Sequence, residues 1–142
     1  MSGERLVGVV LVSHSAEVAV SVAEMASRLA GRGRLAPVVP AGGTPDGGLG
    51  TSSELIAEAA RRADGGAGVA ILVDLGSAVL TVRAMLGEQD DEDEDAALPA
   101  DARLVDAPLV EGAVAAVLTA STGADLDAVA AAAGDAYHYR KV

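Results

Sequence analysis

The sequence has no cysteine, no phenylalanine and no tryptophan among its 142 residues. Without thiols the chain can form no disulfide, thiolate zinc site, iron-sulfur cluster or cysteine nucleophile. Tyr137 and Tyr139 are its only aromatic residues, so the 51% of hydrophobic residues must build an aliphatic core, mainly of Ala, Val and Leu. A chain of this length can bury a sizeable core and needs no covalent or metal cross-link to fold.

Basic residues are also few, with 10 Lys and Arg against 21 Asp and Glu, for a formal net charge of −11. This balance argues against nucleic acid as a partner and favours a partner with a basic contact surface. The first apolar run, Leu6–Val12, is too short for a signal-peptide core or a membrane span. We therefore expect a cytoplasmic protein without a membrane segment, folded as a single domain over residues 1–142.

Strand-like and helix-like segments alternate along the chain. Continuous apolar runs predict strands at Leu6–Val12 and Gly68–Asp74, and shorter runs predict strands at Leu35–Val39, ended by Pro40, and at Arg103–Asp106. Capping residues and helical spacing predict helices that begin near Ser15, at Ser52 or Ser53, and near Ala78, Leu109 and Asp125. An acidic loop over 89–101 and a short polar tail over 135–142 complete the chain.

The helix after Ser15 shows its period in four apolar residues, Val18, Val22, Met25 and Leu29, and Gly31 and Gly33 end it. Repeated strand-helix units of this kind predict an α/β fold with right-handed crossovers. We expect a three-layer sandwich with a mainly parallel four-stranded sheet in flavodoxin-like strand order. Ligands of such sheets gather at the carboxyl ends of the strands.

Polar residues follow three of the predicted strands. They are Ser13, His14 and Ser15 after the first strand, a glycine-rich loop with Thr44 after the second, and Asp74 and Ser77 after the third. His14 lies where a helix begins, and unpaired backbone N–H groups there favour an anion such as a phosphorylated imidazole. An equally open reading makes Ser13-His14-Ser15 a capping turn with a partly exposed histidine.

Asp74 is the candidate partner of His14. A carboxylate that accepts a hydrogen bond from one imidazole nitrogen sets the tautomer and stabilises the charged form of the ring. If the first and third strands are neighbours, their carboxyl ends lie about 5 Å apart, which would bring Asp74 near His14. Both Asp74 and Ser77 could instead, or as well, cap the helix that follows them.

Other patterns in the chain are weaker candidates. The glycine-rich loop lacks the lysine of a phosphate-binding P-loop, and Gly31–Ala36 matches the dinucleotide pattern only in letters, since it leads from a helix into a strand. We interpret His138 as an exposed or packing residue. The acidic run Asp90–Asp95 lacks the spacing of a calcium-binding loop, so we expect no metal site.

Four blocks of the sequence resemble one family. The blocks are VSHS at Val12–Ser15, GTPDGGLGTS at Gly43–Ser52, DLGSA at Asp74–Ala78 and APLVEGA at Ala107–Ala113. In this order and spacing they are similar to the DhaM family, the phosphoryl-carrier subunits of phosphotransferase-dependent dihydroxyacetone kinase. The resemblance spans about residues 6 to 134 and implies the mannose-type enzyme IIA fold.

The resemblance implies a phosphoryl relay. In this family HPr passes a phosphoryl group, originally from phosphoenolpyruvate, to Nε2 of the histidine that matches His14. That histidine then rephosphorylates ADP held on the partner DhaL, and the ATP phosphorylates dihydroxyacetone on DhaK. The resemblance implies a homodimeric phosphotransferase subunit with His14 as its catalytic residue and no cofactor of its own, since ADP or ATP with Mg²⁺ belongs to DhaL.

Phosphoryl transfer asks the protein mainly to align donor and acceptor and to stabilise the equatorial oxygens. Donors near Ser15, Thr44 and Ser77 could do this, with Asp74 supporting the imidazole. The acidic run Asp90–Asp95 does not match the family pattern, and some members continue into HPr-like and enzyme I-like domains. Two alternatives stay open: an enzyme IIA component of a mannose-type sugar transporter, and a non-catalytic module that binds an anion or nucleotide.

Overall fold

A four-stranded sheet forms the centre of the computed structural model, which describes residues 5–87 and 97–142. All pairings are parallel and the strand order is β2-β1-β3-β4, which confirms the predicted flavodoxin-like order. The strands are β1 (Gly8–Ser13), β2 (Val38–Gly42), β3 (Val69–Val73) and β4 (Ala102–Leu104).

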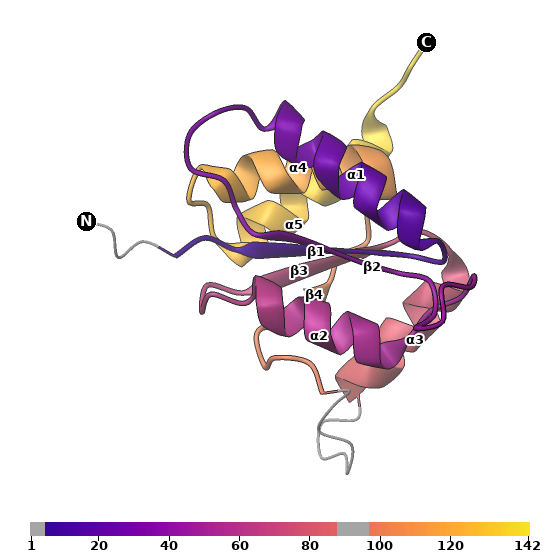
Figure 1. Cartoon of the computed structure of the whole chain (residues 1–142). Helices are drawn as coiled ribbons and strands as arrows, with labels where there is room; N and C mark the ends of the chain where they lie inside the picture. Colours follow the sequence, from indigo (N-terminus) through magenta and orange to yellow (C-terminus); the bar gives the residue numbers. More distant parts are fainter. Residues whose placement is uncertain (1–4, 88–96) are drawn as a thin grey trace.

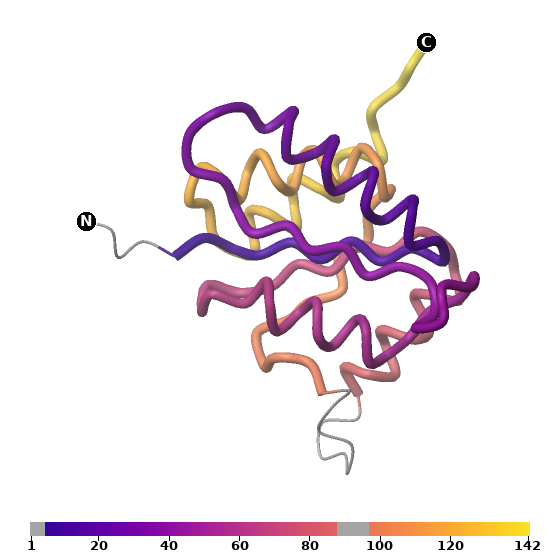
Figure 2. The backbone as a smooth tube through the Cα atoms, viewed as in Figure 1, coloured from indigo at the N-terminus to yellow at the C-terminus, as the bar shows by residue number. Residues whose placement is uncertain are grey.

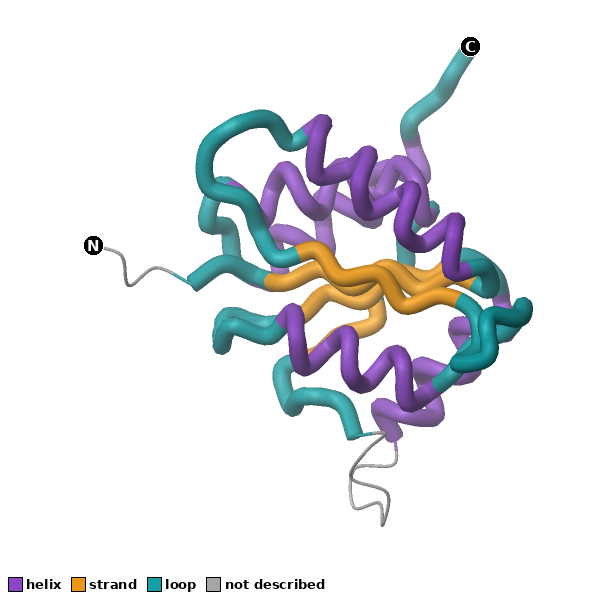
Figure 3. The backbone as a smooth tube through the Cα atoms, in the orientation of Figure 1, coloured by secondary structure: helices purple, strands orange, loops and turns teal. Residues whose placement is uncertain are grey.

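Helices cover both faces of this sheet, which makes the predicted three layers (Figure 1). α1 (Ala16–Leu29), α4 (Leu109–Ser121) and α5 (Leu126–Asp135) lie on one face, and α2 (Ser53–Ala63) and α3 (Gly76–Gly87) lie on the other (Figure 3). Side chains of β1 alternate between the two cores: Val9 and Leu11 face α1 and α4, whereas Val10 and Val12 face α2 and α3. Both cores are aliphatic, as expected, and both tyrosines are largely exposed.

Helix starts follow the capping signals closely. Ser15 caps α1, Ser52 caps α2 and Asp125 caps α5, and in each case the side chain accepts a backbone N–H from the first turn. α4 begins at the predicted Leu109, and α3 begins two residues before the predicted Ala78, at Gly76. These local signals therefore position the helices well.

The predicted position of the second strand was wrong. The sequence indicates Leu35–Val39 with Pro40 as its end, but Pro40 lies inside β2. β2 is an edge strand that pairs only with β1. The backbone groups of Pro37 and Gly43 bond to β1, and along a strand the backbone groups of successive residues point to alternate sides. The backbone nitrogen of Pro40 therefore points away from β1, toward the open edge. A proline costs an edge strand nothing there, because no neighbour needs its missing N–H. β4 likewise ends earlier than the predicted Asp106.

The apolar stripe predicted for α1 is only partly buried. Val22 lies in the core, but Val18, Met25 and Leu29 are 44%, 39% and 62% exposed. Small residues, Ala19, Ala23 and Ala26, form the rest of the buried face. The pattern of large apolar residues did not identify the buried face, because alanine gives only a weak hydropathy signal. Close packing of α1 against α4 and the sheet nevertheless requires small residues such as alanine there.

The C-terminal segment over 135–142 is more ordered than a polar tail. α5 continues to Asp135, and a short 3₁₀ helix, η2 (Ala136–His138), buries Ala136 against the core. Two polar contacts hold the segment: the Tyr137 hydroxyl donates to Asp106 at 2.9 Å, and the Lys141 ammonium donates to Glu111 at 2.7 Å. The prediction missed these contacts because their partners are about 30 residues away in sequence.

Most of the predicted acidic loop over 89–101, including Asp90–Asp95, lies outside the described residues. Across the part of the chain that is described, no helix combines the length and the apolar character needed to cross a membrane.

Candidate functional site

The loops that follow β1, β2 and β3 come together at one end of the sheet, on the right in Figure 2. The parallel register explains this: Ser13 pairs with Gly42 of β2, and Val12 pairs with Val73 of β3. Residues just beyond these three positions must therefore meet at one sheet edge. They are His14, the glycine-rich loop and the turn that starts at Asp74.

His14 and Asp74 are in direct contact at this edge. The Nδ1 atom of His14 lies 3.0 Å from Oδ1 of Asp74, and the two side chains are 24% and 18% exposed. A carboxylate only accepts hydrogen bonds, so the proton of the neutral imidazole belongs on Nδ1. This tautomer leaves the lone pair on Nε2, the nitrogen on the side away from the carboxylate.

Asp74 is itself fixed by further donors. Its Oδ2 accepts from the Ser13 hydroxyl at 2.8 Å and from the backbone N–H of His14 at 3.0 Å, while Oδ1 also accepts from the N–H of Leu75 at 2.7 Å. Partial burial is the largest single influence on the pKa of Asp74 and raises it, but the hydrogen bonds together outweigh burial and lower this pKa. Asp74 is therefore an ionised acceptor at neutral pH.

Ser77 occupies the other side of the ring. Its Oγ, in the first turn of α3, lies 2.5 Å from Nε2 of His14. With the proton on Nδ1, the Ser77 hydroxyl is the donor and Nε2 the acceptor. The hydrogen bond from the Ser77 hydroxyl to Nε2 must break before this nitrogen can form a new bond. The hydroxyl can then donate to a group that is attached to Nε2.

Two serines beside His14 have structural contacts. The Ser15 hydroxyl accepts from the N–H of Val18 at 3.3 Å, so Ser15 acts as the cap of α1. The buried Ser13 hydroxyl accepts from the N–H of Ser15 at 3.1 Å while it donates to Asp74. The sequence singles out Ser13 only as one of the polar residues that follow the first strand, and its place at the end of a buried strand is the signal that it is enclosed.

The glycine-rich loop packs on the backbone around His14. Gly43 donates its N–H to the carbonyl of Ser13 at 3.1 Å, and Gly50 donates to the carbonyl of His14 at 2.9 Å. A side chain at Gly42 would lie 2.5 Å from the Ser15 carbonyl oxygen, so only glycine lets β2 come this close to α1. The loop thus supports His14 through backbone contacts.

The Thr44 hydroxyl is bonded within the loop. It donates to Asp46 and accepts from the N–H of Gly48 at 3.0 Å. The hydrogen bond from Thr44 is the largest cause of a lowered pKa of Asp46, and the N–H of Gly48, which donates to Asp46 at 3.2 Å, lowers this pKa further. Among the hydrogen bonds of the described residues, those of the Thr44 hydroxyl hold the shape of the loop and none reaches the His14 imidazole.

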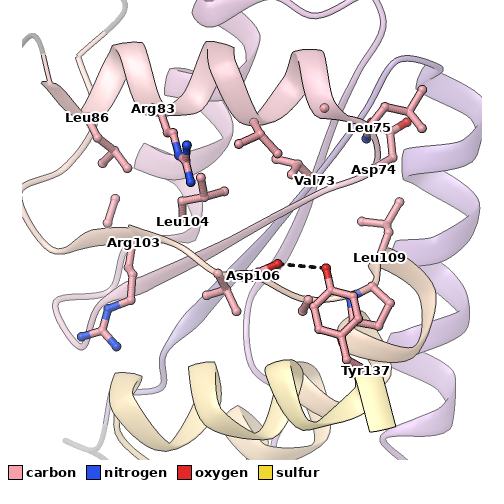
Figure 4. Close-up of a pocket in the computed structure, with 16 residues that line it drawn as sticks. Val73, Asp74, Leu75, Arg83, Leu86, Arg103, Leu104, Asp106, Leu109 and Tyr137 are labelled. Atoms are coloured by element: carbon pink, nitrogen blue, oxygen red, sulfur yellow. Dashed lines mark hydrogen bonds between the residues drawn. The ribbon is translucent and has the colours of Figure 1, made fainter. Parts of the chain in front are cut away.

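A pocket of about 920 Å³ lies beside the site along the outer edge of β4. Asp74 and Leu75 line one end, while Arg83 and Tyr137 project into it from α3 and η2 (Figure 4). His14 does not line this pocket and stands on the surface beside it. A partly exposed imidazole at the surface suits a group that meets another macromolecule better than one that encloses a small substrate.

Within residues 5–87 and 97–142, no three or more His, Asp or Glu side chains gather closely enough to hold a metal ion. His138, the second histidine, is exposed at the end of η2. Neither Asp74 nor Ser77 bonds to it.

Comparison with known proteins places the chain in a family. The family EIIA-man, described as "PTS system fructose IIA component", matches residues 8–130. The chain belongs to the EIIA-man family. This match includes the three loops of the site, and it confirms the expected mannose-type enzyme IIA fold.

Curated relatives of this EIIA-man chain are DhaM subunits. The phosphoryl donor subunit DhaM of PEP-dependent dihydroxyacetone kinase 2 from Listeria innocua is 32% identical over 124 residues, which are 87% of this chain and 94% of that protein. The corresponding subunit of Escherichia coli is 33% identical over 125 residues, 87% of this chain but 25% of that protein. The subunit of Klebsiella michiganensis is 32% identical over 138 residues, 96% of this chain and 28% of that protein.

The EIIA-man chain is thus DhaM-like, and it spans nearly all of the Listeria relative but about a quarter of the E. coli and Klebsiella relatives. The crystal structure of EF1359, a protein of unknown function, superposes with a TM-score of 0.73 at 34% identity and covers 92% of this chain and 95% of that one.

The geometry of this EIIA-man site suits nucleophilic chemistry. One imidazole nitrogen is bonded to a carboxylate, and the other faces an exposed hydroxyl at the protein surface. Such a ring can attack an electrophile through Nε2 while Asp74 stabilises the positive charge that develops on it.

Proposed function

We propose that this chain is a phosphohistidine carrier of the phosphoenolpyruvate phosphotransferase system that serves a dihydroxyacetone kinase. HPr is the phosphoryl donor, and ADP bound on DhaL is the acceptor, from which ATP phosphorylates dihydroxyacetone on DhaK. The chain then needs no cofactor of its own, because ADP or ATP with Mg²⁺ resides on DhaL. It acts in the cytoplasm as a homodimeric phosphotransferase subunit.

The observation that carries this proposal is the pair of contacts on the His14 ring. The contact between Nδ1 and Asp74 leaves the lone pair on Nε2, and the contact of Nε2 with Ser77 lies on the more exposed side of the ring. In the first step Nε2 forms a bond to phosphorus while the phosphorus–nitrogen bond of the donor phosphohistidine breaks and its electron pair returns to the donor ring. In the second step a β-phosphate oxygen of ADP forms the new bond, and the electron pair of the Nε2–phosphorus bond returns to His14.

The site residues take separate parts in this transfer. Asp74 stabilises the charged phosphoimidazole through Nδ1–H. The Ser77 hydroxyl leaves Nε2 and donates to a phosphoryl oxygen, which is the kind of stabilisation that a loose phosphoryl-transfer transition state needs. Ser15 and Thr44 keep α1 and the glycine-rich loop in place around the ring.

Intact mass spectrometry tests the first step. The chain is incubated with phosphoenolpyruvate, enzyme I and HPr, and we expect it to gain the mass of one acid-labile phosphoryl group. The His14→Ala variant should gain none. Phosphate uptake by that variant would show that His14 is not the phosphorylated residue and would indicate His138. If the wild-type chain gains no phosphate, the chain is a non-catalytic module.

A second experiment identifies the acceptor. The phosphorylated chain is mixed with DhaL that holds ADP, and ATP is measured by luminescence. The name of the matched family, "PTS system fructose IIA component", favours one alternative, an enzyme IIA component of a sugar transporter. Transfer to a sugar-specific IIB protein without formation of ATP would establish that alternative.

A further inference from the structure

Two threonines link the glycine-rich loop to the helix that carries Ser77. The hydroxyl oxygens of Thr51 and Thr81 lie 3.2 Å apart, and both side chains are partly buried. Thr51 belongs to the loop between β2 and α2, whereas Thr81 lies in α3, one turn after Ser77. The Thr81 hydroxyl also donates to the backbone carbonyl of Ser77 at 3.1 Å. These contacts run from the loop to the backbone of Ser77, and neither threonine contacts the His14 ring through them.

The direction of the hydrogen bond between the two threonines follows from the Ser77 carbonyl. A carbonyl oxygen only accepts, so the single hydroxyl proton of Thr81 is directed to Ser77. Thr81 then has only lone pairs to offer Thr51, and Thr51 must be the donor. The hydrogen bonds therefore run from Thr51 through Thr81 to the Ser77 carbonyl, and we call this arrangement the threonine bridge.

The loop end of the threonine bridge is fixed on both sides of Thr51. The N–H of Gly50 donates to the carbonyl of His14 at 2.9 Å. Ser52 caps α2, since its hydroxyl accepts from the N–H of Leu55 at 3.2 Å. Thr51 therefore lies between an attachment to the His14 backbone and the start of a helix, and its hydroxyl is a fixed point against which α3 can be held.

The other end of the threonine bridge holds the residue that faces Nε2. Ser77 is exposed in the first turn of α3, where its carbonyl accepts from Thr81 and its hydroxyl reaches Nε2 of His14. Apolar residues of α3 such as Ala78 and Val82 are buried, but apolar contacts have no fixed direction. A hydrogen bond to the Ser77 carbonyl sets both a distance and a direction. The contacts form a closed circuit that begins at the carbonyl of His14 and ends at Nε2 of the same residue.

We propose that Thr51 and Thr81 are positioning residues that hold Ser77 in place for phosphoryl transfer at His14. This inference rests on the proposed carrier function. The Ser77 hydroxyl has two acceptors in turn, Nε2 before transfer and a phosphoryl oxygen after it. Because Thr81 holds its carbonyl, Ser77 changes acceptor by rotating its side chain while its backbone stays in place. Without the threonine bridge the first turn of α3 can shift, and a misplaced donor stabilises the transition state less.

Removal of either hydroxyl tests this role. Thr81→Val and Thr51→Val each lose one hydroxyl and keep a β-branched side chain. Each should lower the maximal single-turnover rate of phosphate uptake by about 3- to 10-fold, the range expected for the loss of one hydrogen bond. The half-saturating concentration of phosphorylated HPr should stay within about 2-fold, because the bridge acts on Ser77 and not on binding of the donor. Uptake is followed by intact mass after a quench in base, since phosphohistidine is acid-labile.

Two further variants complete this comparison. Thr81→Ser keeps the hydroxyl and should recover most of the rate. Thr122→Val is the matched control, because the Thr122 hydroxyl also donates to a helical carbonyl, that of Thr119, at 2.6 Å. Thr122 follows Ser121, whose hydroxyl accepts from the N–H of Ala36 ahead of β2, so it lies at the opposite end of the sheet. The same loss of rate in Thr122→Val, or no recovery in Thr81→Ser, would overturn the positioning role.

A double-mutant cycle separates positioning of Ser77 from a general effect on the fold. If the threonine bridge acts through Ser77, Thr81→Val should change the rate by less than about 2-fold in a Ser77→Ala background. Circular dichroism checks that each variant is folded. A loss of equal size in both backgrounds would show that Thr81 does not act through Ser77, and the proposal would be wrong.

A measurement on the unphosphorylated chain does not depend on the carrier function. The nitrogen NMR resonance of Nε2 of His14 responds to a bonded donor, so Ser77→Ala should shift it. Thr81→Val and Thr51→Val should shift it in the same direction, and Thr122→Val should leave it in place. A resonance that is unchanged in both bridge variants overturns the threonine bridge. Absence of phosphate uptake by the wild-type chain overturns the carrier function instead, and the nitrogen resonance then still decides whether the bridge holds Ser77.

Discussion

The Nδ1 atom of His14 and the Oδ1 atom of Asp74 lie 3.0 Å apart, although the two residues are 60 positions apart in the chain. They meet because β1 and β3 are parallel neighbours with Val12 opposite Val73, and each residue follows its strand closely. The contact gives the ring one bonded nitrogen and one nitrogen with a lone pair.

Replacing Asp74 with asparagine should slow phosphate uptake by at least about 10-fold while the fold is retained. Asparagine is close in size to aspartate, but it removes the charge that stabilises the phosphorylated ring and can turn an NH₂ group toward Nδ1. Single-turnover phosphorylation by HPr, with circular dichroism to check folding, measures this. An unchanged rate would mean that Asp74 serves only to hold the turn in place.

Removing the Ser77 hydroxyl should slow transfer as well. Ser77→Ala loses a donor to a charged phosphoryl oxygen, a loss of about 1.5–3 kcal/mol and thus about 10-fold or more in rate. Ser77→Thr keeps the hydroxyl and should recover most of the rate. If threonine behaves like alanine, the effect comes from packing in the first turn of α3 and the hydroxyl has no part in transfer.

Acid should remove the stability that Asp74 contributes. Burial is the largest influence on its pKa and raises it, but the hydrogen bonds from His14, Ser13 and Leu75 outweigh burial and hold the pKa below the ordinary value of 3.8. A carboxyl with a lower pKa in the folded state stabilises the fold above its unfolded pKa and loses this effect as the pH falls through the folded value.

Urea unfolding of the wild-type chain and of Asp74→Asn over a range of pH tests this linkage. The difference between their free energies of unfolding should shrink as the pH falls from about 5 through the unfolded pKa of Asp74. Asp46 and Glu111 also have lowered pKa values, but both proteins contain them, so they cancel in the difference. A difference that stays constant into acid would contradict the linkage.

Local signals in the sequence predicted the helices better than the edge strand. Ser15, Ser52 and Asp125 act within one helical turn, so a cap and a starting point can be found from the residues alone. β2 was misplaced because the effect of Pro40 depends on which side of the strand has a neighbour. That information lies in the order of strands and not in the residues near Pro40.

The candidate site was predictable only in part, because some of its features depend on local sequence and others depend on strand order and side-chain direction. His14 stood out at the junction of a buried strand and a helix, and a resemblance to the DhaM family supported it. Its pairing with Asp74 followed only if the first and third strands were neighbours. The contact of Ser77 with Nε2, the enclosure of Ser13 and the internal bonds of Thr44 depend on side-chain directions that no local pattern specifies.

The sequence by itself determined the alternation of strands and helices, the aliphatic nature of the core and the residues able to do chemistry, because periodicity, capping and side-chain type act within a few positions. Only the tertiary structure decided which of these residues meet. Strand order and register come from burying both faces of β1 and β3 between two helical layers, a cooperative effect of residues far apart in the chain. That packing brings Asp74 and Ser77 to opposite sides of one imidazole.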